Sequence, residues 1–391
     1  MKAPVYIAGM GTISAAGMDC ESGFKSIIRG DDNVLPLTQF ESGLNSTPLC
    51  ATVNDDVDSR FTNSFRSLSL ARVAATEAMS GLTDRAGLKI GIVAATTVGG
   101  ISVTERIYEQ LKKDPTLNIK SRDLAVHEPC VISAEICRDI NASGFHTVST
   151  ACSTGIHAIG MAKRLIDKGI YDAVLAVGTD ALSLLTVRGF GSLTLLDQNG
   201  CRPFDKRRAG ISLGEGAGAM LLVGSAHRNR CKKVYAVVNG WGASADSFHM
   251  TAPHPEGDGA IRSMQGALNE SGIDKSAINL VITHGTATPD NDKSEIKAIR
   301  NVLGTVPSFC SMKRTLGHTL AASGIIEAVF GVMSLNDNVV PPTGGFEQLD
   351  DEIGIAPGTQ AIYKPLTHVL KNSFGFGGNN ASVIFSKADV A

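Results

Sequence analysis

The chain alternates between short, continuous apolar runs and longer segments in which apolar residues recur every three to four positions. Runs such as 89–95 and 173–177 show no alternation of polar and apolar residues. A strand covered on both faces has this pattern, because neither face meets water. Residues 156–166 instead have the spacing of an amphipathic helix. The pattern predicts an α/β protein in which helices cover both faces of a sheet.

The order of these segments occurs twice along the chain, by pattern rather than by identity. The corresponding segments are 5–11 with 234–240, 89–95 with 279–283, 147–151 with 308–312, and 173–177 plus 219–223 with 369–373 plus 381–385. We therefore expect two similar β/α halves, 1–228 and 229–391, that pack together as one body.

Composition excludes several classes of protein. The 36 Lys and Arg residues are balanced by 38 Asp and Glu residues, so there is no basic excess to bind nucleic acid. Apolar residues make up 43% of the chain, enough for a large core, but no run reaches the roughly twenty residues of a membrane span. Eight scattered cysteines without a C-x-x-C pair, and a start without a secretory segment, predict reduced thiols in the cytoplasm.

Cys152 stands where a predicted strand, 147–151, gives way through small turn residues to a predicted helix. A thiol at a helix N-terminus meets the positive end of the helix dipole, which favours the thiolate. A thiolate activated in this way can act as a nucleophile without an adjacent base. The alternative is a buried structural cysteine.

Two histidines follow predicted strands of the second half. His284 comes directly after 280–283, and His318 lies five residues beyond Lys313. Either could be a structural histidine, but together they could place two N–H donors over one point and hold an oxyanion or enolate. Lys313 could tune the charge of His318. Because ligands bind beyond the carboxyl ends of strands in such sheets, we expect these groups to share one site with Cys152.

Other motifs are less specific. The glycine-rich segment 372–380 could supply a backbone N–H to an oxyanion and use a phenylalanine as a gate, or it could be a plain hairpin. Ser212 lies in a G-x-S-x-G match, but a strand follows where a hydrolase elbow needs a helix. Asp290 and Asp292 resemble an acidic metal cluster, yet Asp292 with Glu295 fits a capping box for a helix over 293–303. No spacing suggests a zinc site.

Taken together, these motifs resemble the β-ketoacyl-[acyl-carrier-protein] synthases of the elongating, Cys-His-His class of the thiolase superfamily. The likeness runs through nearly the whole chain in order. The segments that carry it are Thr150-Ala151-Cys152, His284-Gly285-Thr286-Ala287-Thr288-Pro289, Lys313-x4-His318 and Phe374-Gly375-Phe376-Gly377-Gly378-Asn379. The resemblance implies a thiolase-like fold, with duplicated β/α halves in a five-layered α-β-α-β-α body.

The resemblance also implies a reaction and a role for each site residue. Cys152 takes an acyl chain from a carrier-protein thioester, while His284 and His318 polarise a malonyl thioester so that loss of CO2 leaves an enolate. Attack of the enolate on the acyl-cysteine gives a 3-oxoacyl-[acyl-carrier protein], with the oxyanion on the backbone N–H groups of Cys152 and Phe376. The remaining implied site residues are Lys313 in the catalytic set, Glu327 in support of it, Phe376 as the gate, and Thr286, Thr288, Phe374 and Gly377 at the substrate.

The implied partners are an acyl carrier protein, which brings the phosphopantetheine arm, and a second copy of the chain in a homodimer. No cofactor or metal of its own is implied. Departures such as Asp290-Asn291, where a small or apolar pair is usual, leave substrate and pathway open between fatty-acid and polyketide-type biosynthesis. One alternative is a specialised polyketide or aryl-polyene ketosynthase. Another is a subunit active only as a heterodimer with a chain-length-factor-like partner.

Overall fold

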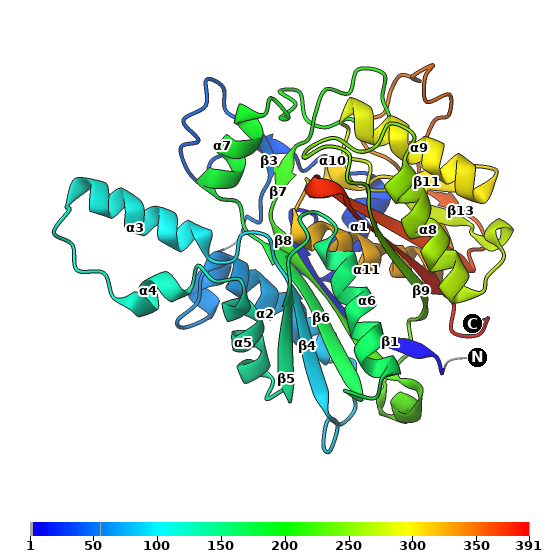
Figure 1. Cartoon of the computed structure of the whole chain (residues 1–391), viewed down its shortest axis with the longest axis horizontal. Helices are drawn as coiled ribbons and strands as arrows, with labels where there is room; N and C mark the ends of the chain where they lie inside the picture. Colours follow the sequence, from blue (N-terminus) through cyan, green and yellow to red (C-terminus); the bar gives the residue numbers. More distant parts are fainter. Residues whose placement is uncertain (1–2, 55, 391) are drawn as a thin grey trace.

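The computed structural model describes residues 3–54 and 56–390, and its main feature is a ten-stranded sheet (Figure 1). The strand order is β11-β10-β14-β15-β9-β1-β8-β6-β4-β5. The strands are β1 Val5–Ser14, β4 Ile90–Ala95, β5 Gly144–Val148, β6 Ala173–Asp180, β8 Gly216–Gly224, β9 Ala236–Ala245, β10 Leu280–Ile282, β11 Ser308–Cys310, β14 His368–Gly375 and β15 Asn379–Ser386.

The two halves of this sheet repeat one order outward from its centre. From β1 the order is β8, β6, β4, β5, and from β9 it is β15, β14, β10, β11. In each half the three outer strands are parallel and the next is antiparallel to them. The halves join where β1 pairs with β9, at Tyr6 with Val237 and Ile7 with Ala236. The segments matched by sequence pattern thus occupy corresponding positions in the two halves.

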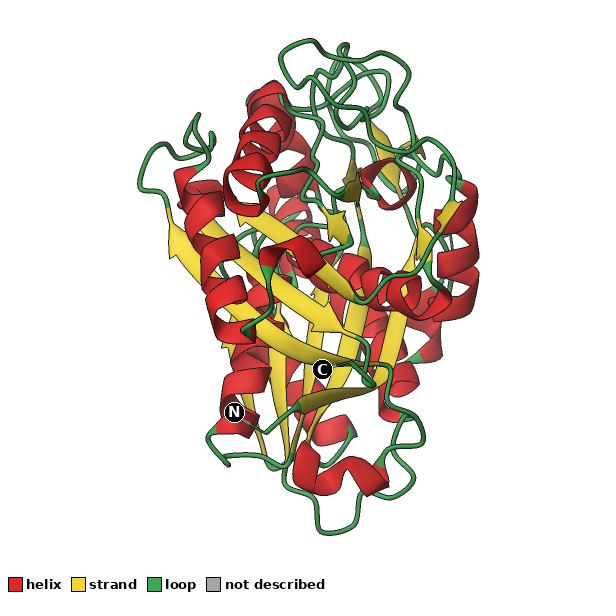
Figure 2. Cartoon of the chain, turned by 90° about the vertical axis from the view of Figure 1, so that its right-hand side faces the viewer, coloured by secondary structure: helices red, strands yellow, loops and turns green. Residues whose placement is uncertain are grey.

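Helices form three layers, one between the two halves of the sheet and one on the outer side of each half, so that with the two halves of the sheet the body has five layers (Figure 2). Two central helices contact strands of both halves, while one outer pair covers the first half and another covers the second. The central helices are α6 Thr154–Asp167 and α11 Ala321–Asp337, and the outer ones are α2 Arg66–Met79 and α5 Cys130–Asp139, then α8 Asp258–Ser271 and α9 Pro289–Leu303.

Smaller elements complete the fold, and the arm formed by α3 and α4 projects from the body (Figure 1). The other helices are α1 Cys20–Arg29, α3 Ile101–Lys113, α4 Ser121–Ala125, α7 Leu184–Ser192 and α10 Lys313–Leu316, and the short strands are β2 Leu35–Pro36, β3 Leu49–Ala51, β7 Leu213–Gly214, β12 Val339–Val340 and β13 Ile362–Tyr363. Four 3₁₀ segments are η1 Val57–Arg60, η2 Ser225–Arg230, η3 Lys275–Ala277 and η4 Phe376–Gly378. Across 3–54 and 56–390, no helix combines the length and apolar character of a bilayer span.

The central helices α6 and α11 cross closely because both carry a glycine at the crossing. A Cβ on Gly155 would lie 2.7 Å from the backbone nitrogen of Ile325, and one on Gly324 would lie 3.0 Å from the side chain of Ile156. Residues on nearly all sides of α11 are buried and mostly apolar, as expected for a helix that lies between the two halves of the main sheet. Since Cys152 precedes α6 and His318 precedes α11, this crossing sets how closely the two residues approach.

Substitution of Gly155 by Ala should destabilise the fold by about 1–3 kcal/mol, because the new methyl group overlaps the backbone of α11. The measurement is the midpoint of thermal unfolding followed by circular dichroism. Gly358→Ala is the control: a Cβ there meets nothing closer than 3.5 Å, so its effect should stay below about 0.5 kcal/mol. Equal midpoints for the two variants would contradict the tight crossing.

Candidate active site

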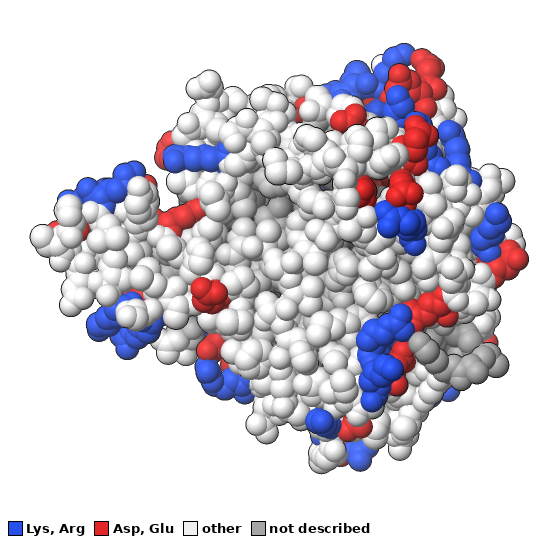
Figure 3. All heavy atoms as spheres, in the orientation of Figure 1, with Lys and Arg blue, Asp and Glu red and all other residues white. Residues whose placement is uncertain are grey.

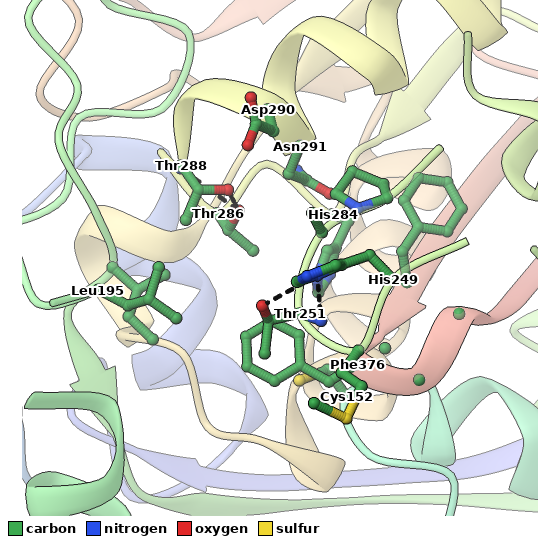
Figure 4. A pocket seen from close by; sticks show the side chains of 18 of the residues that line it. Cys152, Leu195, His249, Thr251, His284, Thr286, Thr288, Asp290, Asn291 and Phe376 are labelled. Atoms are coloured by element: carbon green, nitrogen blue, oxygen red, sulfur yellow. Dashed lines mark hydrogen bonds between the residues drawn. The ribbon is translucent and has the colours of Figure 1, made fainter. Parts of the chain in front are cut away.

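Cys152, His284 and His318 line a single pocket, which is shown in part in Figure 4. Cys152 follows β5 and His284 follows β10, so the pocket lies at the carboxyl ends of parallel strands, where we expected a shared site. Of the other predicted site residues, those that also line it are Thr286, Thr288, Phe374, Phe376 and Gly377. Lys313 and Glu327 are absent from the lining and are buried with 1% and 0% of their surface exposed.

Cys152 sits on a sharp turn between β5 and α6. Ala151, just before it, has a φ of +52°, a left-handed conformation that turns the chain directly into the helix. The backbone N–H groups of Phe376 and of Cys152 itself face the sulfur and act to lower the pKa of the thiol. These two donors come from separate elements and converge on one atom, which is the arrangement that an oxyanion site requires.

The expectation that the helix N-terminus favours a thiolate at Cys152 leaves out the larger effect, which is burial. Burial raises the pKa of the thiol to about 12, although Lys313 and the two backbone N–H groups act in the opposite direction. A helix dipole contributes at most about 2 kcal/mol, and removing a sulfur anion from water costs more than this. The thiol of Cys152 is therefore neutral near pH 7, so any reaction in which its sulfur attacks must also remove its proton.

His318 is held as a neutral hydrogen-bond donor. Its Nδ1 accepts from the backbone N–H of Leu320 at 3.2 Å, so in the neutral ring the proton is on Nε2. Burial lowers the pKa of His318 well below its usual value, and the cations Lys313 and Lys371 lower it further. The ring therefore presents an N–H without carrying a charge.

His284 lies beside His318, with ring centroids 5.4 Å apart and planes at 85°. Its backbone is fixed on both sides, since its N–H donates to Glu295 at 2.9 Å and its carbonyl accepts from Lys313 at 2.9 Å. Burial, Lys313, His318 and Lys371 all lower the pKa of its ring. The Nδ1 atom is buried and makes no hydrogen bond within the described chain, which leaves it available to a substrate or a bound water.

Beneath the histidines, one carboxylate is shared by two buried lysines. Glu327 pairs with Lys313 at 2.5 Å, as the resemblance implied, and also with Lys371 at 2.7 Å. Lys371 was not among the residues predicted from the sequence. A signal was present, because Lys371 follows Val369 and Leu370 in a run typical of a strand buried on both faces.

The capping box expected at Asp292 and Glu295 is wrong, because α9 begins earlier, at Pro289, whose ring is well suited to the first turn. Both carboxylates lie within α9 and accept hydrogen bonds from the backbone of neighbouring loops. Asp292 accepts from the backbone N–H of Phe204 at 2.7 Å, and Glu295 accepts from those of His284 and Gly285 at 2.9 Å each. Across 3–54 and 56–390, no three His, Cys, Asp or Glu side chains are placed to hold a metal.

Other residues of the pocket lining contact one another or a neighbouring ring. The hydroxyls of Thr286 and Thr288 hydrogen-bond each other at 2.9 Å, while the ring of Phe376 stacks on Phe190 with centroids 5.7 Å apart. His249, from the segment after β9, also lines the pocket (Figure 4). Ser212 does not: it is buried and accepts from the backbone N–H of Cys201, which removes the support for a serine hydrolase.

Comparison with known proteins gives consistent matches over the whole chain. The family model for the beta-ketoacyl synthase N-terminal domain matches residues 2–227, and that for the C-terminal domain matches residues 235–347. A 3-oxoacyl-[acyl-carrier-protein] synthase 2 from Staphylococcus aureus (strain N315) is 31% identical over 98% of each chain. One from Vibrio cholerae is 32% identical over 99% of each.

Solved structures agree and confirm the predicted thiolase-like fold. The ishigamide ketosynthase/chain length factor matches with a TM-score of 0.92 and 28% identity, covering 99% of this chain and 100% of that one. A ketosynthase from Xenorhabdus doucetiae, solved in complex with its chain length factor, gives 0.86 and 27%, covering 99% and 98%. The matched domains, the fold and the full-length relatives lead to one conclusion: the chain belongs to the β-ketoacyl synthase family of the thiolase superfamily.

Proposed function

We propose that this chain catalyses a decarboxylative Claisen condensation, in which an acyl group on Cys152 is extended by malonyl-[acyl-carrier protein] to a 3-oxoacyl-[acyl-carrier protein]. The observation that carries the proposal is the convergence of one thiol, two neutral imidazoles and two backbone N–H groups in a single pocket. Each group has a task in one of three steps.

In the first step, the sulfur of Cys152 attacks the acyl thioester carried on a phosphopantetheine arm. The oxyanion that forms is held by the backbone N–H groups of Cys152 and Phe376, which already converge on the sulfur. The pantetheine thiolate leaves and the acyl group stays on the enzyme. Because the thiol is neutral at rest, its proton passes to a neutral imidazole of the pocket and then to the departing sulfur.

In the second step, the carbonyl of a malonyl thioester accepts hydrogen bonds from His284 and His318. The carbon–carbon bond to the carboxylate breaks and CO2 leaves. The electron pair of that bond stays on the thioester fragment, which becomes the enolate. Donors that strengthen as charge develops on the oxygen accelerate this step, and they need not act as bases because no proton is removed from carbon. Burial and the nearby lysines keep both rings neutral.

In the third step, the enolate carbon attacks the acyl-Cys152 carbonyl. The same two backbone N–H groups hold the new oxyanion, which collapses and expels the cysteine sulfur. The expelled cysteine thiolate takes up a proton from solvent, and the 3-oxoacyl chain leaves on the carrier arm. Phe376 supplies one of these donors and stacks on Phe190, so movement of its ring can admit an acyl chain without a separate lid.

The carrier protein would supply the phosphopantetheine arm, and Thr286 and Thr288, which line the pocket, would hydrogen-bond this arm. The halves 1–228 and 229–391 would divide the chemistry, the first supplying the nucleophile and the second the two histidines. The eight cysteines are all unpaired, which supports the proposal of a reducing, cytoplasmic compartment.

An interface with a second chain is favoured by the edge of the sheet at β5. Phe145 on this strand is 45% exposed, and the face of the molecule over β5 and α6 carries few charged side chains (Figure 3). Charge-poor surfaces with exposed aromatic residues suit protein interfaces. A homodimer would cover this edge, and so would a heterodimer with a chain-length-factor-like partner, in which the intact Cys-His-His set makes this chain the catalytic member.

The purified chain should convert hexanoyl- and malonyl-N-acetylcysteamine into a 3-oxooctanoyl thioester, detected by mass spectrometry. Cys152→Ala should form no product and carry no hexanoyl group, because the acyl acceptor is gone. Cys130→Ala, at an exposed cysteine, is the control and should remain active. Acylation that persists in Cys152→Ala would refute the proposal, whereas product formed only after a second synthase-like chain is added would favour the heterodimer.

Loss of either active-site histidine should affect decarboxylation far more than acyl transfer. We expect His284→Ala and His318→Ala to lower CO2 release from malonyl-N-acetylcysteamine about 10²–10³-fold, the effect of deleting one oxyanion donor. Hexanoyl transfer to Cys152 is followed by intact-protein mass in the same preparations. His368→Ala, whose ring bonds Ser386 away from the pocket, should behave like the wild type. Equal losses in both half-reactions would argue against the assigned roles.

The pH dependence should show no titration of an ordinary histidine. Both rings have a pKa well below 6.5, so CO2 release should stay level as the pH falls through 6.5 and decline only at lower values. Unfolding would release the rings to their ordinary pKa, so the fold also loses stability as the pH falls below 6.5. Circular dichroism at each pH separates the two effects, and a half-loss of rate near 6.5 in folded protein would contradict neutral donors.

A further inference from the structure

Lys371 is a fully buried lysine that none of the three steps above uses. It lies in β14, directly before the segment that carries Phe374 and Phe376, and 0% of its surface is exposed. Its ammonium contacts the carboxylate of Glu327 at 2.7 Å, the carbonyl of Thr283 at 3.1 Å and the carbonyl of Asn372. All of its polar partners are therefore oxygen atoms, as a buried cation requires.

The three partners belong to elements that hold the reacting groups. Thr283 directly precedes His284, and Glu327 lies on α11, the helix that follows His318. Asn372 is on the strand that leads to the Phe376 donor. The ammonium of Lys371 thus links the backbone just before His284 to α11, the helix that follows His318.

The charges in this cluster leave a net positive charge under the histidines. Glu327 is shared by Lys313 and Lys371, so the triad carries two cations for one anion. A further carboxylate nearby, Glu295, compensates only in part, because burial raises its pKa to about 7 while Lys371 opposes the shift. Burying such a triad is costly, and an apolar side chain of similar size would serve the fold as well or better.

Electrostatics connects the triad to the histidines. After burial, Lys313 and Lys371 are among the causes that lower the pKa of both His284 and His318. A cation that disfavours a positive imidazole also favours a negative enolate oxygen at the same place. The contacts of Lys371 and its charge therefore both favour a role in stabilising the enolate.

We propose that Lys371 is a positioning residue for decarboxylation: it anchors the backbone at Thr283 under His284, shares Glu327 with Lys313, and places a second fixed cation beneath the enolate site. The inference rests on the proposed function. It assigns Lys371 no contact with the substrate, and it predicts that acyl transfer to Cys152 depends on this residue much less than CO2 release does.

The test is Lys371→Met, which keeps the volume and removes the charge. CO2 release from malonyl-N-acetylcysteamine should fall about tenfold or more, the change expected for a residue coupled within a buried network, and hexanoyl transfer to Cys152 should change by less than about threefold. Lys163→Met is the matched control, because Lys163 is also buried in an ion pair, with Asp167 at 2.8 Å, but lies outside the pocket. It should alter neither half-reaction.

A pH profile adds a readout that a purely structural role would not move. The charged or titratable groups that act on the two imidazoles are Lys313 and Lys371, together with His318 in the case of His284. Glu327 pairs with both lysines, and Glu295 accepts from the backbone N–H of His284. Without the Lys371 cation, the pKa values of His284 and His318 should rise. The fall in the rate of CO2 release at acid pH, the acid limb of the profile, should therefore begin at a higher pH. Lys163→Met should leave the limb in place.

If Lys371→Met does not fold, Lys371→Ala with added methylammonium decides the question, because the amine can occupy the space that truncation leaves. Methylammonium should restore CO2 release in this variant and leave the wild type and Lys163→Ala unaffected. Full CO2 release by Lys371→Met, equal losses in both half-reactions, or no restoration by the amine would overturn the inference. A wild-type enzyme that releases no CO2 would instead refute the proposed function.

Discussion

The active site depends on the close crossing of α6 and α11 between the two halves of the sheet. Gly155 and Gly324 let the helix backbones approach, and the residues just before the two helices bring a thiol and an imidazole to the same pocket. Neither half alone contains both groups. The duplication of the fold therefore matters chemically, because it places the N-terminal ends of two equivalent helices together and lets each carry a different reactive side chain.

Burial at this point determines the charge state of every reacting group. It raises the pKa of the Cys152 thiol and lowers the pKa of both imidazoles, so the unliganded site holds three neutral groups above a positive cluster around Glu327. In the proposed reaction, negative charge would develop on oxygen atoms that face the backbone and imidazole donors. These donors would therefore stabilise the transition states more than the starting groups.

Much of this was predictable from sequence, because strands buried on both faces and strand-end motifs are local patterns. The corresponding segments fall at corresponding strands, and Cys152, His284 and His318 do share a pocket. What failed depends on three-dimensional surroundings: the charge state of Cys152 is set by burial, which no sequence window reports. The orientation of Asp292 and Glu295 follows from where α9 begins and from the loops packed against it.

The departure from the family pattern at Asp290-Asn291 lies apart from Cys152, His284 and His318. Asp290 is exposed at the rim of the pocket, and its neighbour Asn291 lines the wall, whereas the thiol, the imidazoles and the two backbone donors are held by other elements. A change of residue at the mouth alters what can enter without moving the groups that react. For the proposed reaction, substrate preference and chemistry would then depend on separate parts of the pocket, so that a chain 31% identical to a 3-oxoacyl-[acyl-carrier-protein] synthase 2 can differ from it at the rim and still keep the same three side chains together.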